Sequence, residues 1–240
     1  MKKLYERSQL EFFLLWLLIY IGIQNLGHAL EASVPTAWYI VGPGNAALGL
    51  FLWFWLKKNG LLACYGLGKC RVSPGKLLWF LPLVLISTDN LWRGVHANMG
   101  GMDLLFFLLG MGAVGFLEEL LIRGFLFQYL RKDSTAQAVW ISTAAFAAAH
   151  ILNLLTGRLG LLDGLLQVVF ALALGLLYAL VLLKSGSLWP CILSHGAIDM
   201  LSAFAYRGEL SLRERLPLNG LCLFLALGYC LYLWRLPDAE

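Results

Sequence analysis

The sequence predicts an all-α protein, a polytopic bundle of about eight transmembrane helices in which residues 1–240 form a single integral membrane domain. Hydrophobic residues make up 60% of the 240 positions and charged residues only 13%, whereas soluble domains carry about 25% charged residues. The apolar residues also come in long runs. A helix of ~20 mostly apolar residues crosses the hydrocarbon core of a bilayer, so these runs are expected to be membrane spans.

Eight runs have this character. They cover residues 10–30, 36–56, 75–92, 102–130, 136–156, 159–183, 187–206 and 216–235. The first run follows positive residues, as a signal peptide does, but no A-x-A-like cleavage site follows it, so we expect an uncleaved helix. The third run is interrupted by Pro82, Asp89 and Asn90. The fourth is longer than one crossing needs, so we expect it to tilt or to project from the bilayer.

The distribution of positive residues predicts the orientation. With eight spans both termini lie on the same side, and that side receives most of the 18 Lys and Arg residues. Positive loops stay in the cytoplasm. We therefore expect both termini to be cytoplasmic. The expected location of the protein is the cytoplasmic (inner) membrane of a bacterium.

The net charge of +4 does not indicate nucleic acid as a partner, because no stretch combines clustered Lys and Arg with aromatic residues on a polar background. The five Cys residues show no CxxC or metal-ligand spacing, so we expect them to fill apolar helix faces. The expected surroundings are the lipid bilayer.

Charged residues inside the fourth run are the first sign of function. A charge at the centre of a span costs about 2.5–3.5 kcal/mol on the insertion scale, so such residues persist where they have partners inside the bundle. Glu119 and Arg123 are four residues apart, which puts them on one helix face with the acid before the base. Glu118 points about 100° away and has no obvious local partner. The pattern favours one carboxylate neutralised by Arg and one available for proton chemistry.

Two further spans carry ionisable residues at the same spacing. The fifth contains Phe146 and His150, and the seventh contains His195 and Asp199. Small residues surround both histidines and allow helices to approach closely. Counting from each predicted cytoplasmic boundary puts these residues at depths comparable to that of Glu118. We therefore expect the polar faces to converge in one cavity.

Taken in order, these motifs resemble a known family. They are EExxxR (Glu118, Glu119, Arg123), FxxxH (Phe146, His150) and HxxxN/D (His195, Asp199), the last within GSLWPCILSHGAID. They are similar to the three motifs of the CAAX-protease and bacteriocin-processing family of intramembrane endopeptidases, also called the Abi family. The resemblance covers residues 102–206, the expected catalytic core.

The resemblance implies a glutamate-dependent peptidase without a cofactor. Glu118 would be the general base, His150 would help it to activate a water, and His195 with Asp199 would stabilise the oxyanion. Glu119 and Arg123 would hold the site together. Many members have Asn in the place of Asp199, and an ionised Asp cannot donate to an oxyanion. Asp199 would then be protonated, orient His195 or bind a positive group.

A zinc-dependent version of the peptidase stays open, because Glu118, His150, His195 and Asp199 are also plausible zinc ligands, although HExxH is absent. The expected substrate is a membrane-associated protein or peptide. A prenylated C-terminus, a bacteriocin leader and the tail of a sorting signal are all compatible with the sequence.

The sequence also bears on other functions. The sequence contains neither the G-x-S-x-G pattern of serine peptidases nor the GxGD pattern of aspartyl intramembrane peptidases. One feature is compatible with a thiol peptidase, because Cys191 lies four residues before His195 and so on the same helix face. A non-enzymatic immunity or scaffold protein of the same family would need the charges only as a clamp. A proton-coupled transporter is less consistent, because no inverted repeat is visible.

Overall fold

The computed structural model describes residues 1–31, 38–70, 72, 78–155, 159–208 and 212–236, and within them it is all-helical with no strand, as the sequence predicts. The α-helices are α1 Lys2–Arg7, α2 Gln9–Glu31, α3 Trp38–Lys58, α4 Leu81–Ser87, α5 Gly101–Glu119, α6 Phe127–Arg131, α7 Thr135–Leu155, α8 Leu161–Ser185, α9 Trp189–Leu201 and α10 Leu212–Trp234. The chain also has the 3-10 segments η2 Asp89–Leu91 and η4 Ser202–Phe204 and the π-helical segment η3 Leu120–Leu126.

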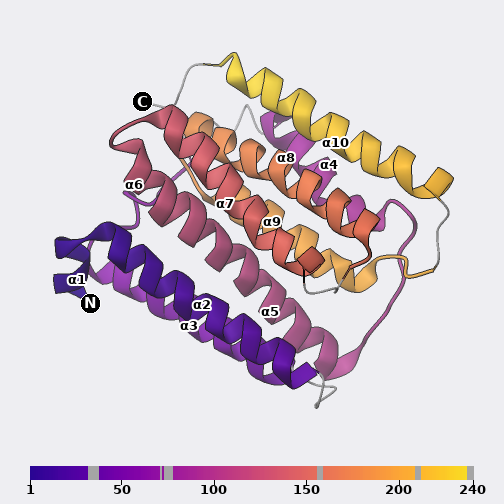
Figure 1. The fold of residues 1–240 in the computed structure, drawn as a ribbon, viewed down its shortest axis with the longest axis horizontal. Helices are drawn as coiled ribbons and strands as arrows, with labels where there is room; N and C mark the ends of the chain where they lie inside the picture. The colour runs from indigo at the N-terminus through magenta and orange to yellow at the C-terminus, as the bar shows by residue number, and fades with distance from the viewer. Residues whose placement is uncertain (32–37, 71, 73–77, 156–158, 209–211, 237–240) are drawn as a thin grey trace.

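The helices form a bundle in which α5 is central. Figure 1 shows α2 and α3 side by side along one edge, α5 crossing the middle, and α10 along the opposite edge. Helix α5 packs against α3 on one side and α9 on the other, α7 packs against α8, and α10 covers α8 and α4. The residues before α2 and the end of α10 lie at the same end of the bundle (Figure 1).

Five helical segments in the described part of the chain are long and apolar enough to cross a membrane. They are Gln9–Gly27, Tyr39–Lys58, Gly101–Arg131, Leu161–Ser185 and Leu216–Trp234. Helix α7 is 21 residues long and α9 only 13. The predicted integral membrane class is therefore confirmed, whereas the predicted number of eight spans is not.

The predicted third span is not one long helix. Residues 75–77 of this span lie outside the described residues. Its regular part in the rest is α4, whose seven residues rise only ~10 Å. Pro82 lies in the first turn of that helix, and Asp89 and Asn90 lie in η2. The residues on either side of this segment nevertheless lie at opposite ends of α9. The Leu188 amide donates to the Gly66 carbonyl at the start of α9, and the His96 amide donates to the Phe204 carbonyl beyond its end.

The outer faces of the bundle are apolar. Leu18 in α2, Phe54 in α3 and Phe224 in α10 expose 65%, 60% and 72% of their surface. Soluble monomers rarely expose contiguous apolar faces of this kind, because they lose the free energy of burying them. The exposed side chains are those expected to face lipid.

Helices α5 and α9 approach closely at two glycines. A Cβ added to Gly115 would lie 2.6 Å from the amide nitrogen of Gly196 and 3.3 Å from the carbonyl carbon of His195. The expected role of the small residue beside His195 is thus confirmed for Gly196. The contact brings the backbone that carries His195 against the helix that carries Glu118 and Glu119.

The long fourth segment is not a regular α-helix throughout. It runs from Gly101 to Arg131 as the sequence predicts, but Leu120–Leu126 is π-helical, and all seven of these residues are buried. Single π turns inside α-helices are rare and frequent at functional sites. The π segment begins directly after Glu119 and contains Arg123.

The contact between α5 and α9 gives a prediction. Gly115→Ala should destabilise the protein by about 1–3 kcal/mol, because the new methyl group meets backbone that cannot turn aside. Gly112→Ala on the same helix is the matched control, since its Cβ would meet only the flexible end of Met200 at 3.4 Å. Thermal unfolding in detergent should show a lower midpoint for Gly115→Ala and an unchanged or higher one for Gly112→Ala. Equal midpoints for the two variants would contradict the close approach.

Candidate functional site

An ion pair with no solvent exposure lies at the centre of the bundle. Arg123 Nη1 donates to Glu119 Oε1 at 3.0 Å, and both side chains have 0% exposure. Arg123 Nη2 also donates to the carbonyl of Gly175 in α8 at 3.3 Å. Its guanidinium lies over the ring of Phe146 in α7, 4.1 Å from the centroid. The pair predicted from the sequence is present, and its Arg ties the π segment to two further helices.

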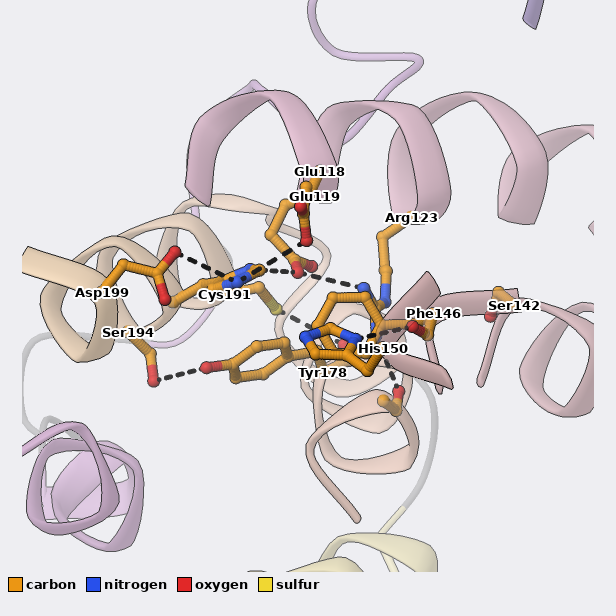
Figure 2. A network of polar contacts seen from close by, with 12 residues as sticks. Glu118, Glu119, Arg123, Ser142, Phe146, His150, Tyr178, Cys191, Ser194 and Asp199 are labelled. Carbon is orange, nitrogen blue, oxygen red and sulfur yellow. Dashed lines mark hydrogen bonds and ion pairs between the residues drawn. The ribbon is translucent and has the colours of Figure 1, made fainter. Parts of the chain in front are cut away.

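His195 in α9 lies among three carboxylates. Its Nδ1 lies 2.9 Å from Oε1 of Glu119. On the other side of the ring, Nε2 lies 3.5 Å from Oδ2 of Asp199 and 3.8 Å from Oε2 of Glu118. In Figure 2 the side chains of Glu118 and Glu119 extend from α5, and Asp199 lies to one side of them on α9. Glu119 therefore holds both Arg123 and His195 through one oxygen atom.

Glu118 has a partner that the sequence analysis did not identify. The hydroxyl of Tyr20 in α2 donates to Oε1 of Glu118 at 2.6 Å. The side chain of Glu118 is 22% exposed, whereas that of Glu119 is 0% exposed. Of the two adjacent carboxylates, Glu118 is the one that an incoming molecule can reach.

His150 lies one side chain away from this cluster. Its ring centroid is 5.0 Å from that of Phe146, and Phe146 lies 5.4 Å from the ring of His195. Nδ1 of His150 lies 3.0 Å from the Phe146 carbonyl oxygen. Because a carbonyl only accepts hydrogen bonds, Nδ1 carries the proton and Nε2 has a lone pair in the neutral ring. The side chains of Phe146 and His150 lie together beside Arg123 (Figure 2).

A second polar chain anchors α9. The hydroxyl of Ser87 donates to the Leu83 carbonyl, so it accepts from Ser194 at 2.7 Å. Ser194 in turn accepts from Tyr178, 3.0 Å away. This chain joins α4, α9 and α8 one residue before His195, and so fixes the helix that carries the imidazole.

The structure thus gathers five of the predicted site residues into one cluster of contacts, Glu118, Glu119, Arg123, His195 and Asp199. The sixth, His150, is separated from His195 by the ring of Phe146. Sequence analysis missed Tyr20 and the Ser87–Ser194–Tyr178 chain. A polar residue in a predicted span was the available signal for Tyr20, but nothing in the sequence indicated that α2 would lie against Glu118.

Cys191, on which the thiol alternative rests, has a hydrogen-bond partner other than His195. Its thiol donates to the Tyr178 carbonyl at 3.4 Å and has 0% exposure. A nucleophilic thiol needs access to substrate and a neighbouring base. The site therefore gives no support to the thiol alternative.

Whether the site can hold a metal ion depends on how its donor atoms are arranged. Within the described residues, no group of three or more His, Cys, Asp or Glu side chains is arranged to hold a metal ion. The ring nitrogens of His195 face carboxylates rather than a common point with His150.

Fold and site together define a class of protein, a helical membrane protein with a buried carboxylate–imidazole cluster reached through one partly exposed glutamate. Residues 100–201, which include all six predicted site residues, match the family described as type II CAAX prenyl endopeptidase, Rce1-like. The resemblance found from the three motifs is thereby confirmed for this segment. The comparisons with curated proteins and with solved structures gave no match. The family match supports a membrane-embedded protease of the CAAX type, with a membrane protein as its substrate.

The central ion pair gives a stability prediction. Arg123→Met should lower the free energy of unfolding by about 3–5 kcal/mol, because it leaves the Glu119 carboxylate buried without its cation. Adding Glu119→Gln should recover part of this loss, since Gln removes the charge and keeps an oxygen that accepts from His195.

Arg7→Met is the matched control, because Arg7 and Glu11 form an i,i+4 pair that is exposed. Unfolding in detergent should show no measurable loss for this variant. If Arg123→Met were as stable as Arg7→Met, the buried pair would not hold the site together.

Proposed function

We propose that the protein is an intramembrane endopeptidase that hydrolyses a peptide bond in a membrane-associated protein or peptide, with Glu118 as the general base. The observation that carries this proposal is the position of Glu118, which is partly exposed, bonded to Tyr20 through one oxygen and 3.8 Å from His195 through the other. Glu119, whose bonded oxygen serves both Arg123 and His195, is left as the framework residue.

The proposed first step is the activation of a water. Oε2 of Glu118 and Nε2 of His195 are 3.8 Å apart. Because this distance is less than the combined length of two hydrogen bonds, one water beside both atoms can be hydrogen-bonded to each of them. Glu118 takes a proton from the water while the water oxygen attacks the substrate carbonyl carbon. We assign His150 to assist Glu118, because its neutral ring has a proton-free Nε2 that can accept a proton.

The proposed second step is charge stabilisation. In this scheme His195 carries protons on both ring nitrogens, donates from Nδ1 to Glu119 and uses Nε2–H for the oxyanion of the tetrahedral intermediate. Asp199 lies 3.5 Å from Nε2, so we assign it to orient and neutralise the imidazolium rather than to donate. This assignment gives an Asp a role at a position where the related family often has Asn. The intermediate then collapses, the C–N bond breaks, and the amine nitrogen takes the proton held by Glu118.

The substrate is inferred from the family match. A prenylated C-terminus is the first candidate, since the matched family is described as a CAAX prenyl endopeptidase. A bacteriocin leader and a sorting-signal tail are the alternatives to be assayed in parallel. We also propose that the membrane is the cytoplasmic membrane of a bacterium, with both termini on the cytoplasmic side as the distribution of positive residues predicts.

The test is an assay of the purified protein in detergent on farnesylated CAAX peptides and on the two alternative substrate types. Glu118→Gln should lower turnover by about 10²–10⁴-fold, because the amide cannot take the proton of the water. Glu6→Gln, which changes an exposed carboxylate in α1, is the control and should leave turnover unchanged. Full cleavage by Glu118→Gln would contradict the proposed base.

The same assay separates two alternatives. The metal-free scheme predicts that a chelator leaves turnover unchanged, and loss on chelation with recovery on adding zinc would replace it by the zinc version. A non-enzymatic scaffold, for which the buried pair would serve as a clamp, predicts no cleavage of any of the three substrates.

A further inference from the structure

We propose that Tyr20 is a positioning residue for the general base, and that α2, which lies outside the segment matched to the family, is therefore part of the active site. This inference rests on the proposed function, because it assigns Tyr20 a role in the chemistry of Glu118. Neither the three motifs nor the family match covers Tyr20.

A chain of hydrogen bonds leads from α3 through α2 to Glu118. Asn45 Nδ2 in α3 donates to Gln24 Oε1 at 3.5 Å, and Gln24 Nε2 donates to the Tyr20 hydroxyl at 2.7 Å. The Tyr20 hydroxyl donates to Glu118 Oε1 at 2.6 Å. Asn45 has 0% exposure and Tyr20 has 6%, so this polar chain lies inside the bundle.

The donors of this chain all point in one direction. Because the Gln24 amide donates to the Tyr20 oxygen, the single hydroxyl proton of Tyr20 is directed to the carboxylate. A neutral donor bonded to a carboxylate gives a strong, short hydrogen bond, in keeping with the 2.6 Å separation.

The consequence is a choice between the two oxygens of Glu118. Tyr20 occupies Oε1, and Oε2 is then the oxygen that faces His195 at 3.8 Å. Without the hydroxyl, the carboxylate can rotate about its last bond and present either oxygen, or turn away from the imidazole. Catalysis depends on holding the base close to its productive geometry, so this loss should lower turnover rather than substrate binding.

A buried tyrosine hydroxyl needs a partner in any protein, so a structural role has to be distinguished from a positioning role. Tyr65 offers a matched comparison. It is 4% exposed, and its hydroxyl donates to that of Tyr5 at 2.8 Å, away from Glu118. Tyr20→Phe and Tyr65→Phe each remove one buried hydroxyl and keep the ring.

The experiment measures kcat and KM for both variants on the substrate that the wild-type protein cleaves. Tyr20→Phe should lower kcat by about 10- to 100-fold with little change in KM, the effect expected for a hydrogen bond to a charged group. Tyr65→Phe should retain the wild-type kcat. Wild-type kcat in Tyr20→Phe, or an equal loss in both variants, would overturn the proposal while leaving the proposed function intact.

Gln24→Met tests the direction of the chain. It should lower kcat less than Tyr20→Phe does, and the double variant should be no slower than Tyr20→Phe alone, because Gln24 acts only through the hydroxyl. Losses that multiply in the double variant would show that Gln24 acts by another route and would overturn the chain.

A measurement without substrate separates this proposal from the proposed function. In protein carrying ¹³C-labelled Glu carboxylates, the infrared band lost in Glu118→Gln belongs to Glu118. Tyr20→Phe should shift that band and Tyr65→Phe should not, and an unshifted band would overturn the proposal. If the band shifts but the protein cleaves none of the substrates, the contact between Tyr20 and Glu118 is supported and the proposed peptidase function is contradicted.

Discussion

The buried ion pair between Glu119 and Arg123 is the constraint on which the rest of the site depends. Both side chains are fully buried, and the cost of removing two charges from water is offset only where each group finds several partners. Arg123 has the Gly175 carbonyl and the face of Phe146, and Glu119 has Nδ1 of His195. One pair thus joins the long segment of α5 and η3 to the three helices α7, α8 and α9.

The adjacent glutamates differ because of their surroundings. The Glu119 side chain lies in the packed interior. Glu118, the preceding residue of the helix, points toward α2, and its side chain is partly exposed. The close approach of Gly115 and Gly196 sets the distance between α5 and α9, and with it the distance between these carboxylates and His195. We propose on this basis that Glu119 is the framework carboxylate and Glu118 the reactive one, within the protease class that the family match supports.

Much of this arrangement could be predicted from the sequence because the i,i+4 spacing of Glu119 with Arg123, and of His195 with Asp199, fixes a helix face whatever the tertiary structure. The spacing could not show which helices would lie beside these faces. The contact of Tyr20 with Glu118 joins residues 98 positions apart, and the π segment after Glu119 has no local sequence signal. The predicted third span is not a single helix in the structure, and Pro82 with the polar residues Asp89 and Asn90 was the sequence signal for this irregularity.

The division of labour between Glu118 and Glu119 is the central claim, and the thermal unfolding midpoints of Glu118→Gln and Glu119→Gln in detergent test it most directly. Glu119→Gln should unfold several degrees below the wild-type protein, because it leaves the Arg123 guanidinium buried without its anion. Glu118→Gln should stay near the wild-type midpoint, since its side chain is partly exposed and its amide oxygen can still accept from Tyr20. Equal midpoints, or a larger loss for Glu118→Gln, would contradict the assignment of framework and reactive carboxylates.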